Sequence, residues 1–116
     1  MDRIVKAFLN SASAWRHLIS KEKAFQQEAA LLALALPLAL VVAEGALHFV
    51  MLSGAVLLIL IVEVLNTGIE AACDAFSREF HADIKIAKDC GSLAVLLSIV
   101  LAASIWSAAL WERFGV

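Results

Sequence analysis

The sequence predicts an all-α membrane protein, in which an N-terminal amphipathic surface helix precedes three transmembrane helices. Hydrophobic residues make up 63% of the 116 residues and charged residues only 17%, which is too apolar for a soluble domain of this length. Long apolar runs also alternate with short polar segments. We expect a single membrane domain over residues 1–116, because no linker or internal repeat divides the chain.

The charge argues against a nucleic-acid partner, and the position of the cysteines argues against a disulfide. The net charge is −2 and no cluster of Lys and Arg is present, so we expect no nucleic-acid partner. Cys73 and Cys90 flank a polar segment that is assigned below to the cytoplasmic side, where thiols stay reduced. We therefore expect no disulfide.

Residues 1–22 form the predicted surface helix. One side of this helix is apolar, with Ile4, Val5, Phe8, Ala12, Trp15 and Ile19. The opposite side is polar and mainly basic, with Asp2, Arg3, Lys6, Asn10, Arg16 and Lys21. This pattern is typical of a helix that lies in the headgroup layer of a membrane. An ordinary helix packed on protein is the alternative.

Three spans follow, and the predicted bounds are 24–47, 49–76 and 91–112. The first contains Pro37, which removes one backbone donor and bends a helix. A short polar turn, Ala43-Glu44-Gly45, separates the first span from the second. Residues 77–90 are polar and are predicted to form a cytoplasmic loop before the third span.

The distribution of Lys and Arg predicts the orientation. Basic residues occur before residue 24 and again from 78 to 88, but none lies near the turn at 44–48. Because basic loops stay on the cytoplasmic side, we expect a cytoplasmic N-terminus and an outside C-terminus. Trp106 and Trp111 then fall near the outer aromatic belt as possible anchors.

A polar row interrupts the cytoplasmic half of the second predicted span. At about 100° per residue, Asn66, Glu70 and Asp74 each lie within roughly 60° of Glu63 around the helix. A carboxylate at the depth of Glu63 costs about 2.5 to 3.5 kcal/mol unless it is paired, hydrated or protonated. Such a residue indicates function, the alternative being a neutral glutamic acid that bridges helices.

Further charged groups approach this row from the cytoplasmic side. Glu22 and Glu28 lie at the mouth of the first span, and the segment after the second span carries His81, Asp83, Lys85, Lys88 and Asp89. Carboxylates next to lysines favour Mg²⁺ and phosphate. His81 has no second ligand at zinc spacing, so it is interpreted as an ATP contact, and Lys85 as a topology-setting charge. No P-loop or Gly-rich nucleotide loop is present.

Three stretches carry a family resemblance: EVLNTGIEAACD at 63–74, EFH at 79–81 and AKDCGSLAV at 87–95. They resemble the prokaryotic diacylglycerol kinase family of small three-span membrane enzymes. The resemblance extends upstream through KAFQQE at 23–28 and the amphipathic N-terminus, so it covers nearly the whole chain. It implies a homotrimer in the bacterial inner membrane, with active sites shared between subunits. The implied reaction is phosphorylation of diacylglycerol to phosphatidic acid by Mg-ATP.

The resemblance also implies roles in catalysis and metal binding. Glu63 is implied as the general base, which takes the proton of the lipid hydroxyl, and Asn66 as the neighbour that orients it. Glu22 and Glu70 are implied as the pair of carboxylates that binds the Mg²⁺ bridging the ATP phosphates.

Substrate contacts are implied in the same way. Glu28 and Trp106 are assigned to binding of the lipid substrate. The implied nucleotide contacts are Arg3, Asp74, Glu79, His81, Lys88 and Asp89. Lys88 is expected to offset the developing phosphoryl charge.

Some positions depart from the family pattern. Phe80 and Asn10 stand where the family has tyrosines, which removes two hydroxyl groups from the implied nucleotide site. Gly68 stands where the family has alanine. Small residues at 67, 68, 71 and 72 would let another helix approach closely, in keeping with a packed trimer.

Other functions stay open. An undecaprenol kinase would use the same phosphoryl-transfer residues, although the AFQQE segment favours the diacylglycerol branch. A small proton-coupled exporter would use Glu63 as a proton carrier, but leaves the polar residues of 81–89 unexplained. A non-enzymatic assembly protein leaves both acidic sets unexplained.

Overall fold

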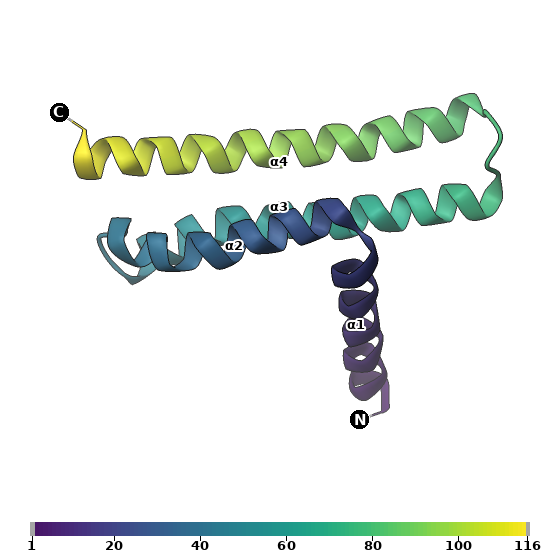
Figure 1. The fold of residues 1–116 in the computed structure, drawn as a ribbon, viewed down its shortest axis with the longest axis horizontal. Helices are drawn as coiled ribbons and strands as arrows, with labels where there is room; N and C mark the ends of the chain where they lie inside the picture. The colour runs from purple at the N-terminus through teal and green to yellow at the C-terminus, as the bar shows by residue number, and fades with distance from the viewer. Residues whose placement is uncertain (1, 116) are drawn as a thin grey trace.

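The computed structural model describes residues 2–115 and is helical throughout apart from short links (Figure 1). Its helices are α1 (Asp2–Lys21), α2 (Lys23–Val42), α3 (Ala46–Phe76) and α4 (Ala82–Phe114). In the described residues α2, α3 and α4 are each long and apolar enough to cross a membrane. The predicted all-α fold with three candidate spans is therefore confirmed.

Helix α3 is the centre of the bundle. It packs against both α2 and α4, which hardly touch each other. One buried cluster near the α2–α3 turn combines Ala39, Val42, Leu52 and Ala109, and a second combines Ala55, Ile59 and Ala102. Alanines at these contacts let the helix backbones approach closely, as is usual between transmembrane helices.

Helix α1 leaves the bundle at a steep angle (Figure 1). Only its C-terminal end is anchored: Leu18 packs with Phe25 and Leu60, and Gln26 Nε2 donates a hydrogen bond of 2.9 Å to the carbonyl of Ile19. Toward the N-terminus its apolar side is open, with Phe8 72% exposed. An apolar side without a protein partner favours the surface-helix interpretation over a helix packed on its own chain.

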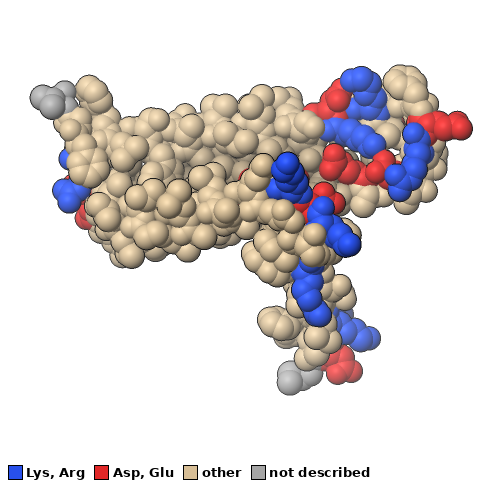
Figure 2. All heavy atoms as spheres, in the orientation of Figure 1, with Lys and Arg blue, Asp and Glu red and all other residues tan. Residues whose placement is uncertain are grey.

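Helices α3 and α4 project past the corner between α1 and α2. They contain 31 and 33 residues, against 20 in α2, and the extra turns of α3 add about 16 Å of length. Charged side chains gather on this projecting end and along α1, whereas the middle of the bundle shows almost none on the face in Figure 2. The polar residues after Glu63 are thus carried beyond the apolar part of the bundle.

The segment 77–90, predicted as a loop, is helical over most of its length. Only residues 77–81 lie between α3 and α4, because α4 begins at Ala82. Residues 82–90 contain neither Gly nor Pro, Asp83 lies in the first turn where the helix dipole favours an acid, and Lys85 pairs with Asp89 at 2.6 Å. Lys88 and Asp89 are therefore carried by a regular helix rather than by a loop.

The turn between the first two spans is close to the prediction. Residues 43–45 separate α2 from α3, although α2 ends at Val42 rather than at 47 and α3 begins at Ala46 rather than at 49. The helix α2 runs through Pro37 without a break.

Candidate active site

The polar row predicted on the second span forms a graded path along α3. Glu63 and Asn66 are buried, at 6% and 8% exposure. Glu70 and Asp74, one and two turns further, are half-buried. One side of a single helix thus leads from the apolar bundle to its polar end, as the helical spacing predicted.

A polar pocket of about 490 Å³ opens beside the outer half of this row. It is lined by residues of α1, α3 and α4, of the link before α2 and of the link before α4, namely His17, Glu22, Thr67, Glu70, Ala71, Asp74, Ala75, Arg78 and Lys88. Glu22 and Glu70 come from separate elements but line the same pocket. The structure therefore brings the two implied metal ligands together with two of the implied nucleotide contacts.

These two carboxylates fit Mg²⁺ in one particular way. Within residues 2–115 no group of three or more His, Cys, Asp or Glu side chains is close enough to hold a metal by itself. Mg²⁺ commonly binds through one or two carboxylates and takes its other oxygens from water and substrate phosphates. The donor set suits a metal that arrives with a phosphorylated substrate, and not a permanently caged ion.

Lys88 links the ends of α3 and α4. Its Nζ donates a hydrogen bond of 2.7 Å to Asp74 Oδ1, and both side chains are about one third exposed. Lys88 also borders a second pocket of about 250 Å³, which includes Glu79, His81 and Asp89. Because Lys88 and Arg78 each line both pockets, these two cations are best placed to contact an anion that extends from one pocket to the other.

The second pocket is built by the link between α3 and α4. His81 packs edge to face on Phe76, with ring centroids 5.9 Å apart, and Ser77 Oγ accepts a hydrogen bond of 3.1 Å from the backbone N–H of Glu79. The Lys85–Asp89 pair on its rim is more than 60% exposed on both sides. An exposed pair of this kind contributes little to stability, about 0 to 1 kcal/mol, so Asp89 remains free to exchange partners.

At the buried end of the row, hydrogen bonding is incomplete. Thr67 Oγ1 donates a bond of 3.1 Å to Glu63 Oε2. Asn66 Oδ1 and Glu28 Oε1 are buried, yet neither has a hydrogen-bond partner in the described part of the chain. An unsatisfied buried polar atom costs about 1 to 3 kcal/mol, and such atoms are expected where a substrate supplies the missing partner.

An apolar pocket of about 270 Å³ borders the buried end of the row. It lies in the angle between α1 and α3 and is lined by Ser11, Ala14, Trp15, Leu18, Phe25, Leu57, Leu60, Ile61 and Val64. Leu60 and Val64 flank Glu63 in the sequence. Glu63 lines neither pocket itself, but its hydrogen-bond partner Thr67 lines the polar pocket, and its sequence neighbours Leu60 and Val64 line the apolar one.

Comparison with known proteins identifies the family. Residues 9–110 match the model of the prokaryotic diacylglycerol kinase family. The chain belongs to this family. It is 40% identical over 113 residues to the diacylglycerol kinase of Escherichia coli K12. The match covers 97% of this chain and 93% of that protein. The resemblance inferred from the sequence motifs is confirmed.

Other members of the family are more distant but match over similar lengths. The diacylglycerol kinase of Haemophilus influenzae is 24% identical and that of Pseudomonas aeruginosa 32% identical. The matches cover 96% and 92% of this chain, and 94% and 87% of those proteins. Family membership and the candidate spans together make this chain a multi-pass membrane protein.

Two predicted site residues of this family member lie away from the polar pocket of their own chain. Arg3 is exposed near the free end of α1, 14 residues before His17, which corresponds to about 21 Å along the helix. Trp106 lies opposite Leu52, and the Trp106 Nε1 donates a hydrogen bond of 2.9 Å to the Leu52 carbonyl. Leu52 is about 16 Å from Glu63 along α3, at 1.5 Å per residue.

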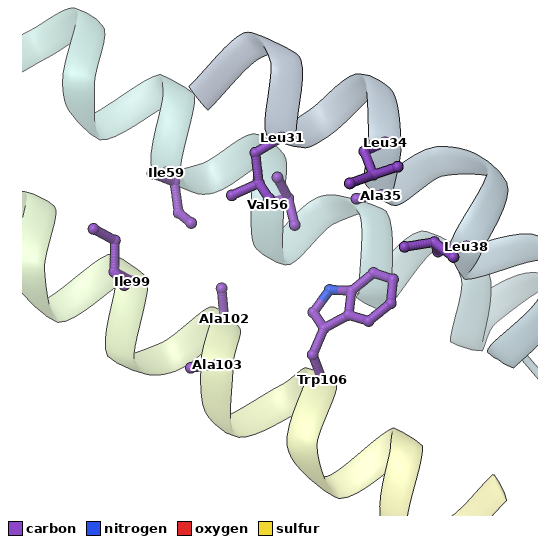
Figure 3. Close-up of a pocket in the computed structure, with 10 residues that line it drawn as sticks. All are labelled: Leu31, Leu34, Ala35, Leu38, Val56, Ile59, Ile99, Ala102, Ala103 and Trp106. Carbon is purple, nitrogen blue, oxygen red and sulfur yellow. The ribbon is translucent and has the colours of Figure 1, made fainter. Parts of the chain in front are cut away.

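Trp106 instead lines an apolar pocket of about 250 Å³ in the middle of the bundle (Figure 3). Residues of three helices surround this pocket, namely Leu31, Leu34, Ala35, Leu38, Val56, Ile59, Ile99, Ala102 and Ala103. The indole points inward from α4, so the structure places it within the bundle and not as an outward-facing anchor of the membrane interface. The exposed Trp111 keeps that predicted role.

Three residues of the polar pocket were missed by the sequence analysis. Thr67 follows Glu63 by four residues within α3, so helical spacing would have found it. Arg78 lies beyond the end of α3, in the link to α4, where helical spacing does not apply. His17 belongs to α1 and reaches the pocket only because α1 turns sharply into α2, for which no local pattern exists.

Proposed function

We propose that this protein is an ATP-dependent lipid kinase that phosphorylates diacylglycerol to phosphatidic acid. Membership of the diacylglycerol kinase family supports the reaction class. The observation that carries the proposal is the position of Glu63, whose sequence neighbours line an apolar pocket and whose hydrogen-bond partner Thr67 lines the polar pocket. A lipid alcohol requires an apolar environment and a nucleoside triphosphate a polar one. Transfer between the two substrates needs these environments side by side.

Glu63 is the proposed general base. It accepts the proton of the primary hydroxyl as the oxygen attacks the γ-phosphorus of ATP, and ADP leaves. The hydrogen bond from Thr67 holds one oxygen of the carboxylate, which leaves the other for the substrate. Asn66, one turn further, supplies a free acceptor, and Glu28 a second near the mouth of the first span, so both suit contact with lipid hydroxyl groups.

The polar pocket is the proposed site of the triphosphate. Glu22 and Glu70 would hold Mg²⁺, which when bound offsets phosphate charge. Lys88 stabilises the charge that develops on the transferred group. The remaining proposed nucleotide contacts, Asp74, Glu79, His81 and Asp89, line the two pockets that Lys88 joins.

A cytoplasmic position of the polar pocket is part of the proposal. The Lys and Arg residues of α1 and of the α3–α4 end lie on the same side of the bundle, as Figure 2 shows. By the positive-inside rule this side faces the cytoplasm, where ATP is available. The N-terminus is then cytoplasmic and the C-terminus outside.

The reaction itself is the first test. Purified protein in mixed micelles with Mg²⁺ and labelled ATP is offered diacylglycerol or undecaprenol in parallel, and we expect label in diacylglycerol. Chelating the metal with EDTA should remove activity, because the carboxylates of Glu22 and Glu70 repel phosphates and can hold them only through a shared cation. Label in undecaprenol alone would assign the protein to the other substrate, and label in neither lipid removes the kinase proposal.

A homotrimer with shared active sites is also proposed. Arg3 lies too far along α1 to reach the polar pocket of its own chain, so it can contact a nucleotide only at a neighbouring subunit. The side of α3 that points away from the acidic row is exposed and carries Ile61, Leu65, Gly68 and Ala72. Small residues there allow close contact between copies of α3.

Adding bulk to this side of α3 should weaken the trimer. We expect Ala72→Leu to shift the protein in detergent toward smaller species, because the larger side chain separates the helices. Chemical crosslinking and sedimentation measure the change. Ala33→Leu makes the same substitution at an exposed position of α2 and should keep the wild-type size. Equal behaviour of the two variants would refute an interface on this side of α3.

A further inference from the structure

Gly91 faces Asn66 across the contact between α3 and α4. Gly91 is buried, on the third turn of α4. A Cβ built on Gly91 would overlap Asn66 Oδ1, and would lie 3.0 Å from Asn66 Cγ and 3.7 Å from its Cβ. The space occupied by the Asn66 amide is therefore the space that a side chain at position 91 would take.

Backbone conformation does not explain a glycine at this position. Gly91 has no positive φ and lies inside a regular helix, where alanine is more favourable than glycine. Gly54 and Gly68 are also helical, but a Cβ there would meet nothing within 4 Å. At position 91 the reason for glycine is thus the contact with one particular side chain.

The Asn66 amide has little freedom to move away. The residue is 8% exposed, and the neighbouring Glu63, one turn earlier on the same side of α3, is 6% exposed. Oδ1 makes no hydrogen bond that would hold it in the described structure. Its position is set by packing, and a methyl group at Gly91 would rotate the amide and change which atoms it presents beside the Glu63 carboxylate.

We propose that Gly91 is a positioning residue of the phosphoryl-transfer site. By lacking a Cβ it leaves the space that the Asn66 amide occupies, and so allows the Asn66 rotamer that lies beside Glu63. This inference rests on the proposed function. The competing explanation is that Gly91 only lets α3 and α4 approach, as small residues do elsewhere in the bundle.

The kinetic test uses Gly91→Ala in the full-length protein with Mg-ATP and diacylglycerol. We expect kcat to fall by about 10²-fold, the effect of misplacing a catalytic group by about 1 Å. KM for Mg-ATP should stay unchanged, because Gly91 does not line the polar pocket. Ala94→Val adds bulk at an exposed position of α4, one turn after Gly91, and should retain wild-type kcat.

A double-mutant cycle separates positioning from packing. In Asn66→Ala the overlapping atoms are absent, so adding Gly91→Ala should change kcat by no more than about twofold. If Gly91→Ala lowers kcat by the same factor with and without Asn66, or leaves wild-type kcat unaffected, the proposal is overturned. Should Gly91→Ala alone fail to fold, the double variant is expected to fold normally, and its failure would also overturn the proposal.

A spectroscopic measurement does not depend on activity. The chain contains two asparagines, Asn10 and Asn66, so ¹⁵N-asparagine labelling gives two side-chain amide signals. Gly91→Ala should shift the signal of Asn66 and leave that of Asn10 in place, whereas Gly54→Ala should shift neither. An unmoved Asn66 signal contradicts the inference. If the wild-type protein phosphorylates no lipid, the proposed function fails. The Asn66 signal still tests the contact between Gly91 and Asn66.

Discussion

Replacing Glu63 by glutamine is expected to abolish phosphoryl transfer while the fold and ATP binding are retained. Glutamine has nearly the same shape, and Thr67 Oγ1 can still donate to its amide oxygen as it does to Glu63 Oε2. What is lost is a group that can accept the proton of the lipid hydroxyl. General bases contribute about 10² to 10⁴-fold to a rate, so a fall in kcat of this size is expected from initial rates in mixed micelles.

Two further measurements make this result specific. Binding of a non-hydrolysable ATP analogue with Mg²⁺ should be close to wild type in Glu63→Gln, because Glu63 does not line the polar pocket. Glu44→Gln makes the same change at the exposed turn between α2 and α3, and full activity is expected there. Near-normal turnover by Glu63→Gln would show that another group accepts the proton.

Lys88→Met is expected to give the second large loss. Lys88 is the lysine that lines both pockets of the polar end, and methionine keeps most of its length without the charge. Removing one donor to a developing negative charge typically lowers kcat by about 10² to 10³-fold. The kinase assay measures this, and Lys23→Met is the control with full activity expected, because Lys23 is exposed at the start of α2 and lines neither pocket.

Lys88 also joins two helices through Asp74, so a structural effect has to be separated from a catalytic one. Asp74→Asn removes the ion pair but keeps the lysine. If Lys88 serves mainly to hold α4 on α3, both variants should lose thermal stability and activity alike. If it acts on the phosphates, Lys88→Met should lose far more activity than Asp74→Asn at a similar melting temperature.

The helical spacing of single residues was enough to predict the acidic row. Glu63, Asn66 and Glu70 share one side of α3 because their positions in the sequence determine their angles around the helix. The same spacing would have added Thr67. The length of the apolar segments likewise predicted which helices could cross a membrane.

The polar segment before the third span was harder to interpret. Residues 82–90 are charged, and polarity alone suggested a loop, but Asp83 and the Lys85–Asp89 pair stabilise the first turns of α4. A charged segment beyond the membrane can continue a helix because water satisfies its side chains while the backbone bonds remain within the helix. Lys88 owes its place opposite Asp74 to this continuation.

By itself the sequence determined the three apolar spans, the side of α3 that is polar, and the family resemblance, because each depends on residues close together in the chain. Tertiary structure alone decided which helices meet: it brought Glu22 to Glu70, seated Asn66 against Gly91, and turned Trp106 inward toward Leu52. These contacts join residues 25 to 54 positions apart. They depend on how small residues set the distance and register between packed helices, which no pattern within one helix encodes.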